Sequence, residues 1–355
     1  MEPPTFDLTL LKGARFQCRP GCGLCCFTTP AVTSEERGAL LHILPDLPLA
    51  EPSEGGGGGF ARIASRDEGG ACHLLERSRC RAHSARPFPC RSFPLHTSLE
   101  RRVQVSLVLS CPGVELTQLT AWGAHAGPVD PPVGLAGEIG AVERELQRAD
   151  LSERASQVSR TWERALRTFR RREPQQDLDH LVEEMVEHPP LPTEEDFPAV
   201  PPPPAAEGLE LLPLSFDEEW KIVAWSEADE GWELLKLREE GGPGEPIGTY
   251  PPPDRLPRMD HAGTTLLRGY LSYVARRDRF LSQLLAEWLP QREYRLHEIA
   301  SGTLRQLGAE VLARGMVLSM LRGQGTEQLG EHAVELGIRA TDMDHLDQST
   351  LGEQL

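Results

Sequence analysis

The sequence lacks the long apolar segments that membrane proteins need. It contains no run of about 18 apolar residues, which is the least that a membrane-spanning helix requires. The first residues, from Met1 to Pro4, also lack the basic start and the apolar stretch of a secretory signal. Cysteine is missing from the 244 residues after Cys111. We therefore expect a cytoplasmic protein without a membrane segment, in which any cysteine chemistry belongs to the N-terminal part.

The charge of the chain is acidic and unevenly distributed. The 355 residues carry a formal net charge of −17, with 39% hydrophobic and 26% charged residues, as is typical of globular proteins. Residues 1–125 hold 13 Lys and Arg against 12 Asp and Glu, whereas the remaining residues hold 24 against 42. Because an acidic surface repels phosphate groups, we expect no nucleic-acid binding.

The pattern of apolar residues predicts a predominantly helical α+β protein. Apolar side chains recur every three to four positions from Val142 to Phe169 and from Leu267 to Leu321, as in amphipathic helices. The runs Trp220–Trp225 and Trp232–Leu237 are strand-like, and they favour a small β-hairpin. The proline-rich stretch 189–204 is typical of an extended linker.

Changes in composition predict how the chain is divided. We expect, in order, an irregular metal-stapled cysteine-cluster domain (1–125), a helical segment (126–188), the linker (189–204), a hairpin plus helical domain (205–323) and an acidic C-terminal tail (324–355). Within the first of these, Thr33 or Ser34 is expected to cap a helix over Glu35–Leu47. Val103–Leu109 alternates like a short strand, and Gly55–Gly59 is expected to be an exposed flexible loop.

The cysteines are concentrated in one part of the chain. All eight lie between Cys18 and Cys111, and in a reducing compartment such clustering indicates metal ligands before disulfides. The first group is Cys18-Arg-Pro-Gly-Cys22-Gly-Leu-Cys25-Cys26, whose Pro and Gly residues favour tight turns with amides that stabilise thiolates. Because neighbouring side chains of an extended chain point apart, we expect Cys25 and Cys26 to serve different metal ions or different atoms of one cluster.

The other four thiols are spread over a longer stretch. Eight thiols are enough for two four-thiolate sites, or for one cluster with spare ligands, and both alternatives stay open. The candidate metal ligands are Cys18, Cys22, Cys25, Cys26, Cys72, Cys80, Cys90 and Cys111.

Neighbouring side chains bear on the choice of metal. His73, His83 and His96 could each replace a thiol, although a lone histidine is more often a surface group. Zinc suits an irregular domain that has little apolar core. An iron–sulfur cluster suits amide donors and cationic side chains, which are supplied here by Arg15, Arg19, Arg86 and Arg91. Together with the double cysteine, these favour iron–sulfur over zinc.

These motifs resemble the YkgJ-type cysteine-cluster family. The shared residues are Phe16-x-Cys18-x3-Cys22-Gly23-x-Cys25-Cys26, Cys72-x-Leu74-Leu75, Cys80, Arg86-Pro87-x2-Cys90-Arg91-x-Phe93-Pro94 and Cys111-Pro112-Gly113. Because the family is described as chelating zinc or iron, the resemblance implies a metal or iron–sulfur site over residues 16–113. This chain departs from the family in having three residues between its first two cysteines instead of two, and in its glycine-rich insert.

Two further similarities bear on activity. The layout is similar to that of flagellin lysine-N-methylases, which join a cysteine cluster to a helical C-terminal part, and this implies group transfer to a protein. The spacing Cys18-x3-Cys22-x2-Cys25 also matches the cluster motif of radical S-adenosylmethionine enzymes. No alternation of strands and helices follows it, which disfavours a radical enzyme of that kind. S-adenosylmethionine stays a possible cofactor, although no binding motif for it supports the assignment.

Two classes of function therefore stay open. One is a redox or group-transfer enzyme built on a cluster, such as a protein methylase. The other is a zinc-stapled protein-interaction module without catalysis, which presents the acidic helical part to a protein partner. The sequence identifies no catalytic residues and no substrate.

Overall fold

The structure is a computed structural model of the chain. The residues that it describes are 6–19, 22, 24–27, 30–50, 61–64, 72–76, 79–116, 119, 134–148, 152–197, 212–213, 221–226, 231–236, 245–250, 255–321 and 328–346. The glycine run Gly55–Gly59 lies outside these residues.

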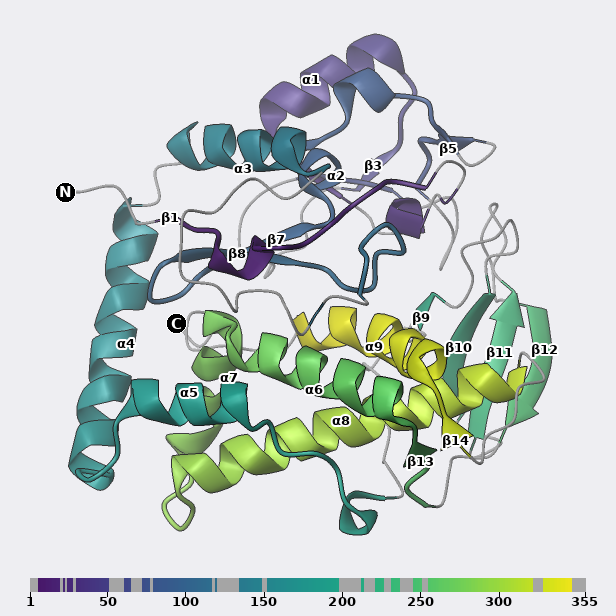
Figure 1. The fold of residues 1–355 in the computed structure, drawn as a ribbon. Helices are drawn as coiled ribbons and strands as arrows, with labels where there is room; N and C mark the ends of the chain where they lie inside the picture. Colours follow the sequence, from purple (N-terminus) through teal and green to yellow (C-terminus); the bar gives the residue numbers. More distant parts are fainter. Residues whose placement is uncertain are drawn as a thin grey trace.

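The protein is a predominantly helical α+β structure, as predicted (Figure 1). The helices are α1 (Ser34–Ile43), α2 (Phe88–Ser92), α3 (Ala136–Arg148), α4 (Ser152–Arg172), α5 (Leu178–Glu187), α6 (His261–Ala275), α7 (Asp278–Trp288), α8 (Leu296–Leu321) and α9 (Glu331–Leu346). Short 3-10 turns occur at Thr9–Leu11, Leu24–Phe27, His83–Ala85 and Glu194–Asp196.

The strands form several small sheets. They are β1 (Phe6–Asp7), β2 (Ala31–Val32), β3 (Leu49–Ala50), β4 (Ala61–Ile63), β5 (Leu75–Glu76), β6 (Arg79–Cys80), β7 (Leu95–Leu99), β8 (Val103–Leu107), β9 (Leu212–Pro213), β10 (Lys221–Ser226), β11 (Gly231–Lys236), β12 (Glu245–Tyr250), β13 (Arg258–Met259) and β14 (Gln328–Leu329). Their orders are β1-β8-β7, β2-β4-β3, β12-β11-β10-β9, β5-β6 and β13-β14.

Local sequence signals account for several of these elements. Helix α1 begins at a capping box, in which the Thr33 side chain accepts from the Glu36 amide and the Glu36 carboxylate accepts from the Thr33 amide. The expected hairpin is confirmed by the antiparallel pairing of β10 with β11, which places Trp225 opposite Trp232. Strands β9 and β12 extend it to a four-stranded sheet.

One hydrophobic core joins the N-terminal layer to the helices that lie beneath it in Figure 1. Val105 and Leu107 of β8 are fully buried, and they belong to the same cluster as Tyr270 of α6, Leu284 of α7 and Ile338 of α9. The core therefore crosses the boundary expected near residue 125, because the β7–β8 hairpin supplies one of its walls.

A second, smaller cluster lies around α1 and β4. It contains Leu40, Ile63 and Leu74 together with the buried Cys72, and Cys26 and Cys80 pack against it. A core of this size gives limited stability by itself, so a bound metal would contribute strongly to folding here.

Part of the segment expected as an acidic tail is the helix α9. Val334 and Ile338 are completely buried in the main core. Asp342, which contributes to the acidic pattern, is also buried and pairs with Arg277 at 2.8 Å. The composition of residues 331–346 suggested an acidic tail, since the local sequence shows Asp342 without its partner. The cation that neutralises Asp342 lies 65 positions earlier in the chain.

Part of the expected linker packs against α8. The side chain of Asp196 pairs with Arg305 of α8 at 3.4 Å, and Pro192 lies against Gly308 of the same helix. Residues 198–204 lie outside the described part of the chain, so the division at 189–204 stays a prediction.

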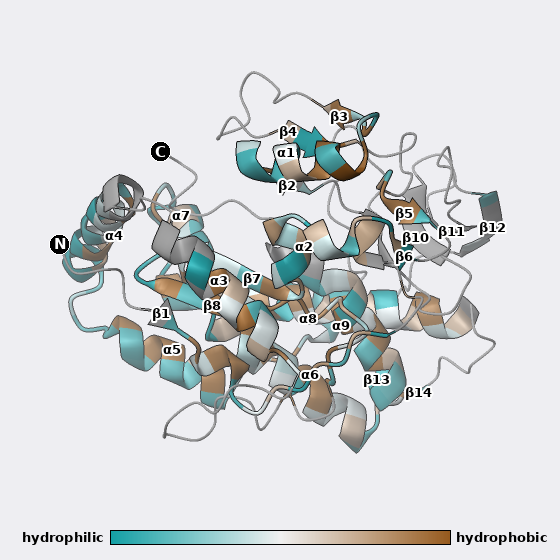
Figure 2. Ribbon diagram, turned by 90° about the horizontal axis from the view of Figure 1, so that it is seen from above, coloured by the Kyte–Doolittle hydropathy of each residue, from teal (hydrophilic) through white to brown (hydrophobic). Residues whose placement is uncertain are grey.

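Hydrophilic and hydrophobic residues alternate around α5 (Figure 2), as expected for a helix that packs one face on the core. The buried face consists of Leu178, Leu181 and Met185. Over the described residues, every helix is too short or too polar to traverse a bilayer.

Helices α8 and α9 approach closely at two glycines. A β-carbon at Gly337 of α9 would lie 2.0 Å from the carbonyl oxygen of Val311, and one at Gly315 of α8 would lie 2.5 Å from that of Ala333. Contacts this short are forbidden, so the crossing requires that both positions lack a side chain.

We therefore expect Gly337→Ala to destabilise the protein by about 2 kcal/mol or more, because the backbones of α8 and α9 must separate. Chemical denaturation measured by circular dichroism will test this. Gly302→Ala on the same α8 is the matched control, since nothing lies within 4 Å of its β-carbon position. It should stabilise the helix by about 0.5–1 kcal/mol, and equal effects of the two substitutions would contradict the interpretation.

Candidate metal centre

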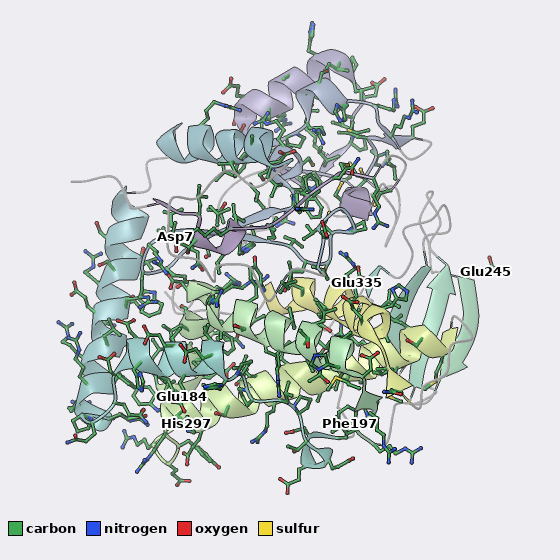
Figure 3. The ribbon with its side chains drawn as sticks, viewed as in Figure 1. Asp7, Glu184, Phe197, Glu245, His297 and Glu335 are labelled. Atoms are coloured by element: carbon green, nitrogen blue, oxygen red, sulfur yellow. The ribbon has the colours of Figure 1, made fainter. Side chains whose placement is uncertain are left out.

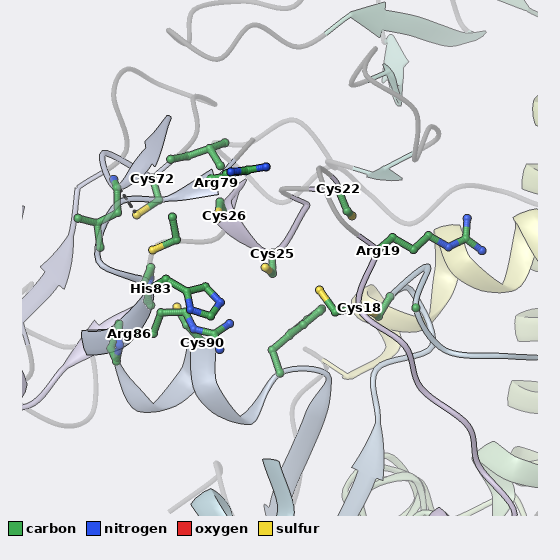
Figure 4. A pocket seen from close by; sticks show the side chains of 18 of the residues that line it. Cys18, Arg19, Cys22, Cys25, Cys26, Cys72, Arg79, His83, Arg86 and Cys90 are labelled. Carbon is green, nitrogen blue, oxygen red and sulfur yellow. Dashed lines mark hydrogen bonds between the residues drawn. The ribbon is translucent and has the colours of Figure 1, made fainter. Parts of the chain in front are cut away.

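All eight cysteines line one pocket in the N-terminal layer. The pocket has a volume of about 470 Å³, and every cysteine is a free thiol. Figure 4 shows the labelled thiols around a common space, with Cys25 between those at the left and those at the right. The structure thus brings together the residues that the sequence singled out, although Cys111 lies 93 positions after Cys18.

Backbone pairing joins the first and last of these thiols. The segment that leads into Cys18 lies antiparallel to the segment that follows Cys111: Phe16 forms a bridge with Val114, and the Gln17 amide donates to the Gly113 carbonyl at 2.9 Å. Gly113 is needed because a β-carbon there would lie 2.6 Å from the carbonyl oxygen of Gln17.

A second set of backbone bonds joins the central thiols. The Cys72 amide donates to the Cys26 carbonyl at 2.6 Å. Strands β5 and β6 then form a hairpin in which Cys80 lies opposite Leu75. The Leu74 amide donates to the sulfur of Cys72 at 3.5 Å, an N–H···S bond that stabilises a thiolate.

Cys90 is held on the short helix α2. Pro87 precedes the helix, and its carbonyl accepts from the Cys90 amide at 3.0 Å. The carboxylate of Glu36 in α1 accepts from the Phe88 amide at 2.7 Å and pairs with Arg91 at 3.3 Å. The same glutamate that caps α1 therefore fixes α2 beside the pocket.

The adjacent pair Cys25 and Cys26 differs from the expectation. The residues Leu24–Phe27 form a 3-10 turn instead of an extended segment, and the two thiols share a hydrogen bond. This bond lowers the pKa of Cys25 to about 7 and raises the pKa of Cys26 well above its usual range. The premise that the two side chains point apart is wrong, because a helical turn brings neighbouring sulfurs within reach.

Burial and mutual repulsion raise the pKa of Cys18, Cys80, Cys90 and Cys111. Burial is the largest cause at Cys90, and repulsion by the thiolates of Cys25, Cys72 and Cys80 adds to it, so that its pKa is about 12. Repulsion of this kind disfavours the simultaneous ionisation of these thiols, and a cation among them would relieve it.

Cys111 shows the same behaviour with different neighbours. Burial is the largest cause of its raised pKa of about 12; the Gly113 amide opposes the rise, and Cys22 and Cys25 add to it. The thiols that repel Cys111 are thus partly different from those that repel Cys90, and Cys25 acts on both.

Arg86 lines the pocket, and its charge acts on several of the thiols. Its charge opposes the rise in pKa at Cys18, Cys80 and Cys90, and it helps to lower the pKa of Cys25. Its buried Nε has no hydrogen-bond partner among the described residues. A cation in this place offsets the negative charge of bound thiolates or of a cluster.

The structure separates the other basic residues that the sequence proposed. Arg19 lines the pocket with Arg86, whereas Arg15 pairs with Glu115 at 4.0 Å and Arg91 pairs with Glu36. Arg79 also lines the pocket and was not anticipated. Its position beside Cys80 was the only available signal.

The histidines are separated in the same way. His83 lines the pocket (Figure 4), whereas His73 and His96, which are both described, do not. Burial and the cations Arg277 and Arg279 lower the pKa of His96 to about 3, which keeps it neutral in β7. His83 is therefore the histidine that stays a candidate for the pocket.

The donor set fits a thiolate-binding metal. Soft thiolates select zinc, iron–sulfur clusters or copper(I) over hard cations such as magnesium. Among the described residues, no group of three or more His, Cys, Asp and Glu side chains is placed so that it could hold a metal ion as it stands. The fit therefore rests on the chemistry of eight thiols in one pocket and on the cations beside them.

Comparison with known proteins agrees with this chemistry. Residues 17–112 match the family model described as "CxxCxxCC: Putative zinc- or iron-chelating domain". Residues 17–112 form a CxxCxxCC domain. No curated protein and no solved structure matches the chain. The CxxCxxCC domain begins just before Cys18 and ends just after Cys111, so it encloses all eight thiols of the pocket.

Proposed function

We propose that the CxxCxxCC domain holds metal through all eight cysteines, arranged as two groups of four. The observation that carries the proposal is that all eight line one pocket, where their repulsion makes simultaneous ionisation unfavourable without a cation. Backbone bonds join some of the members of each group.

The first group surrounds the β5–β6 hairpin. The Cys26–Cys72 backbone bond and the hairpin itself support it, as does the repulsion that Cys72 and Cys80 exert on both Cys26 and Cys90. Its members are Cys26, Cys72, Cys80 and Cys90.

The second group surrounds the pairing of residues 15–17 with residues 113–115. The backbone bonds between these segments support it, as does the repulsion that Cys22 and Cys25 exert on Cys111. Its members are Cys18, Cys22, Cys25 and Cys111. Cys25 lies between the groups, since its charge also acts on Cys80 and Cys90.

We propose iron–sulfur as the form of the metal. Amides of Leu74, Ala82 and Gly113 donate to cysteine sulfurs, and Arg19, Arg79 and Arg86 line the pocket. Amide donors and cations of this kind lower the free energy of an anionic cluster. When bound, such a cluster would supply an electron-transfer or group-activating centre.

The activity that this supports is redox or group transfer, such as methylation of a protein substrate, in the cytoplasm and without nucleic acid or membrane as partner. Methylation would require S-adenosylmethionine as the methyl donor, and no binding motif for it is found in the sequence. The second candidate is a zinc-stapled module that presents the acidic helices to a protein partner. It is favoured by the small core around α1, which bound zinc would stabilise.

Anaerobic purification of the full chain, followed by metal and sulfide analysis and an absorption spectrum, will test the proposal. We expect iron with an equal amount of inorganic sulfide, and absorption in the visible range that is lost on oxidation or chelation. About two zinc ions per chain and a silent spectrum would favour the interaction module instead. A protein that holds neither metal after reconstitution would contradict metal binding altogether.

A further inference from the structure

The segment that carries Cys111 is held by hydrogen bonds from side chains of the C-terminal helical part. As the chain leaves β8, Tyr273 of α6 accepts a hydrogen bond from the Leu107 amide at 2.8 Å, and Arg277 donates to the Leu107 carbonyl at 2.9 Å. Two residues later, Asp342 of α9 accepts from the Leu109 amide at 2.7 Å. Each of these bonds joins residues more than 160 positions apart, so tertiary structure alone creates them.

Arg339 of α9 makes the closest contact with the cysteine turn itself. Its guanidinium donates to three backbone carbonyls, those of Leu109 at 3.1 Å, Cys111 at 2.6 Å and Val114 at 2.8 Å. Arg339 is only 3% exposed, so these bonds are shielded from water. Three carbonyls that converge on one planar cation fix the path of the chain on both sides of the Cys111 thiol.

The guanidinium is in turn oriented from its own helix. Glu335, one turn earlier in α9, accepts from Nε and Nη2 of Arg339 at 3.0 and 2.7 Å. Figure 3 shows Glu335 on the side of α9 that faces the N-terminal layer. Glu335 thus restrains the orientation of the guanidinium that contacts the cysteine turn.

The same turn is bonded on its other side to the rest of the thiol pocket. Val114 pairs with Phe16, and the Glu115 amide donates to the Arg15 carbonyl at 3.0 Å. The Cys111 turn thus lies between α9 and the segment that leads into Cys18. Any shift of α9 would be transmitted to both thiols.

We propose that Arg339 is a positioning residue for the second thiol group, which couples the docking of α9 to metal binding by Cys111. The inference rests on the proposed metal function. The C-terminal helix is by this inference a part of the metal centre, although it contains no cysteine.

The test compares Arg339→Gln with Arg314→Gln. Arg314 on α8 is the matched control because it is also buried, at 1% exposure, and donates to a backbone carbonyl of α9, that of Ala340, at 2.6 Å. Arg314 also pairs with Glu310 of its own helix. Two quantities are measured for each variant: the rate of metal transfer to a chelator, and hydrogen exchange at the Cys111 and Val114 amides.

We expect Arg339→Gln to speed both metal transfer and amide exchange by about tenfold or more, because a charged donor to three buried carbonyls is lost. Arg314→Gln should lower the overall stability of the protein. Its rate of metal transfer and its rates of exchange at the Cys111 and Val114 amides should stay near those of the wild type. Equal changes in the two variants would show that Arg339 has only a general structural role. Unchanged rates in Arg339→Gln would overturn the inference as well.

Two further experiments distinguish this outcome from misfolding of the variant and from failure of the proposed metal function. If Arg339→Gln does not fold, Glu335→Gln replaces it, since this variant removes the group that orients the guanidinium and should speed both rates about threefold. If the wild-type protein holds no metal, the proposed function fails. Amide exchange at Cys111 and Val114 in the metal-free protein still tests whether Arg339 positions the turn.

Discussion

A Cys90→Ser variant is expected to lose the metal of the first thiol group and to loosen the region around α1 and the β5–β6 hairpin. A serine hydroxyl is a poor ligand where a soft thiolate is needed. Structural metal binding contributes folding free energy on the order of 10 kcal/mol, and the small hydrophobic cluster of this region cannot replace it. Helices α6 to α9 contain no cysteine and should stay folded.

Metal content and limited proteolysis of the anaerobically purified proteins will test this expectation. Cys22→Ser should empty the second group in the same way, so each single variant should keep about half of the metal and the double variant none. Thr33→Ala serves as control, because loss of its helix cap costs about 0.5–2 kcal/mol in the same region without removing a thiol.

The pattern of loss separates the alternatives. If each single variant loses all of its metal, the eight thiols hold one shared cluster. If both single variants keep all of it and show the wild-type cleavage pattern, these cysteines are not ligands, and the assignment of the pocket is wrong.

The second large effect is expected from Arg277→Met. Arg277 and Asp342 are 1% and 0% exposed, and they pair at 2.8 Å beneath the segment that carries Cys111. Removing the cation leaves a buried carboxylate that keeps the Leu109 amide as a donor but has lost its charged partner, and breaking a buried pair in this way typically costs about 3–5 kcal/mol. The Leu107 carbonyl also loses its donor. Denaturant unfolding of wild type and variant in parallel will measure the change.

Two comparisons make that measurement specific. Replacing both partners, as in Arg277→Met with Asp342→Leu, should restore much of the loss, because no charge then stays buried alone. The exposed pair of Arg81 and Glu76, 3.5 Å apart, is the control, and Arg81→Met should cost less than about 1 kcal/mol. A loss below 1 kcal/mol for Arg277→Met would mean that water reaches Asp342.

Local signals in the sequence were sufficient for much of the fold class. Thr33 and Glu36 are three positions apart, and that spacing alone predicts where α1 begins. The hairpin of β10 and β11 follows from two strand-like runs with a short acidic loop between them. Helical spacing predicted the long helices. It did not predict that residues 331–346 would form a further packed helix, since the acidic composition of that segment suggested a tail.

The thiol pocket shows the same division between local and distant information. The Gly and Pro residues between Cys18 and Cys25 indicated metal ligation from the sequence. That Cys25 and Cys26 share a hydrogen bond depends on the 3-10 turn, which the extended-chain premise did not foresee. The tertiary structure decided which basic side chains line the pocket: Arg15 pairs with Glu115 and Arg91 with Glu36, whereas Arg19 and Arg79 are pocket residues.

The sequence by itself determined the residue types that this protein uses: eight thiols in its first third, mostly helical structure after them, and acidic charge over the remainder. Only the tertiary structure decided that Arg339 and Asp342, more than 220 positions beyond Leu109, would hold the turn of Cys111. The physical reason is that thiol spacing and helix periodicity act over a few residues along the chain. A buried hydrogen bond depends instead on which distant backbone groups the folded core leaves without a partner.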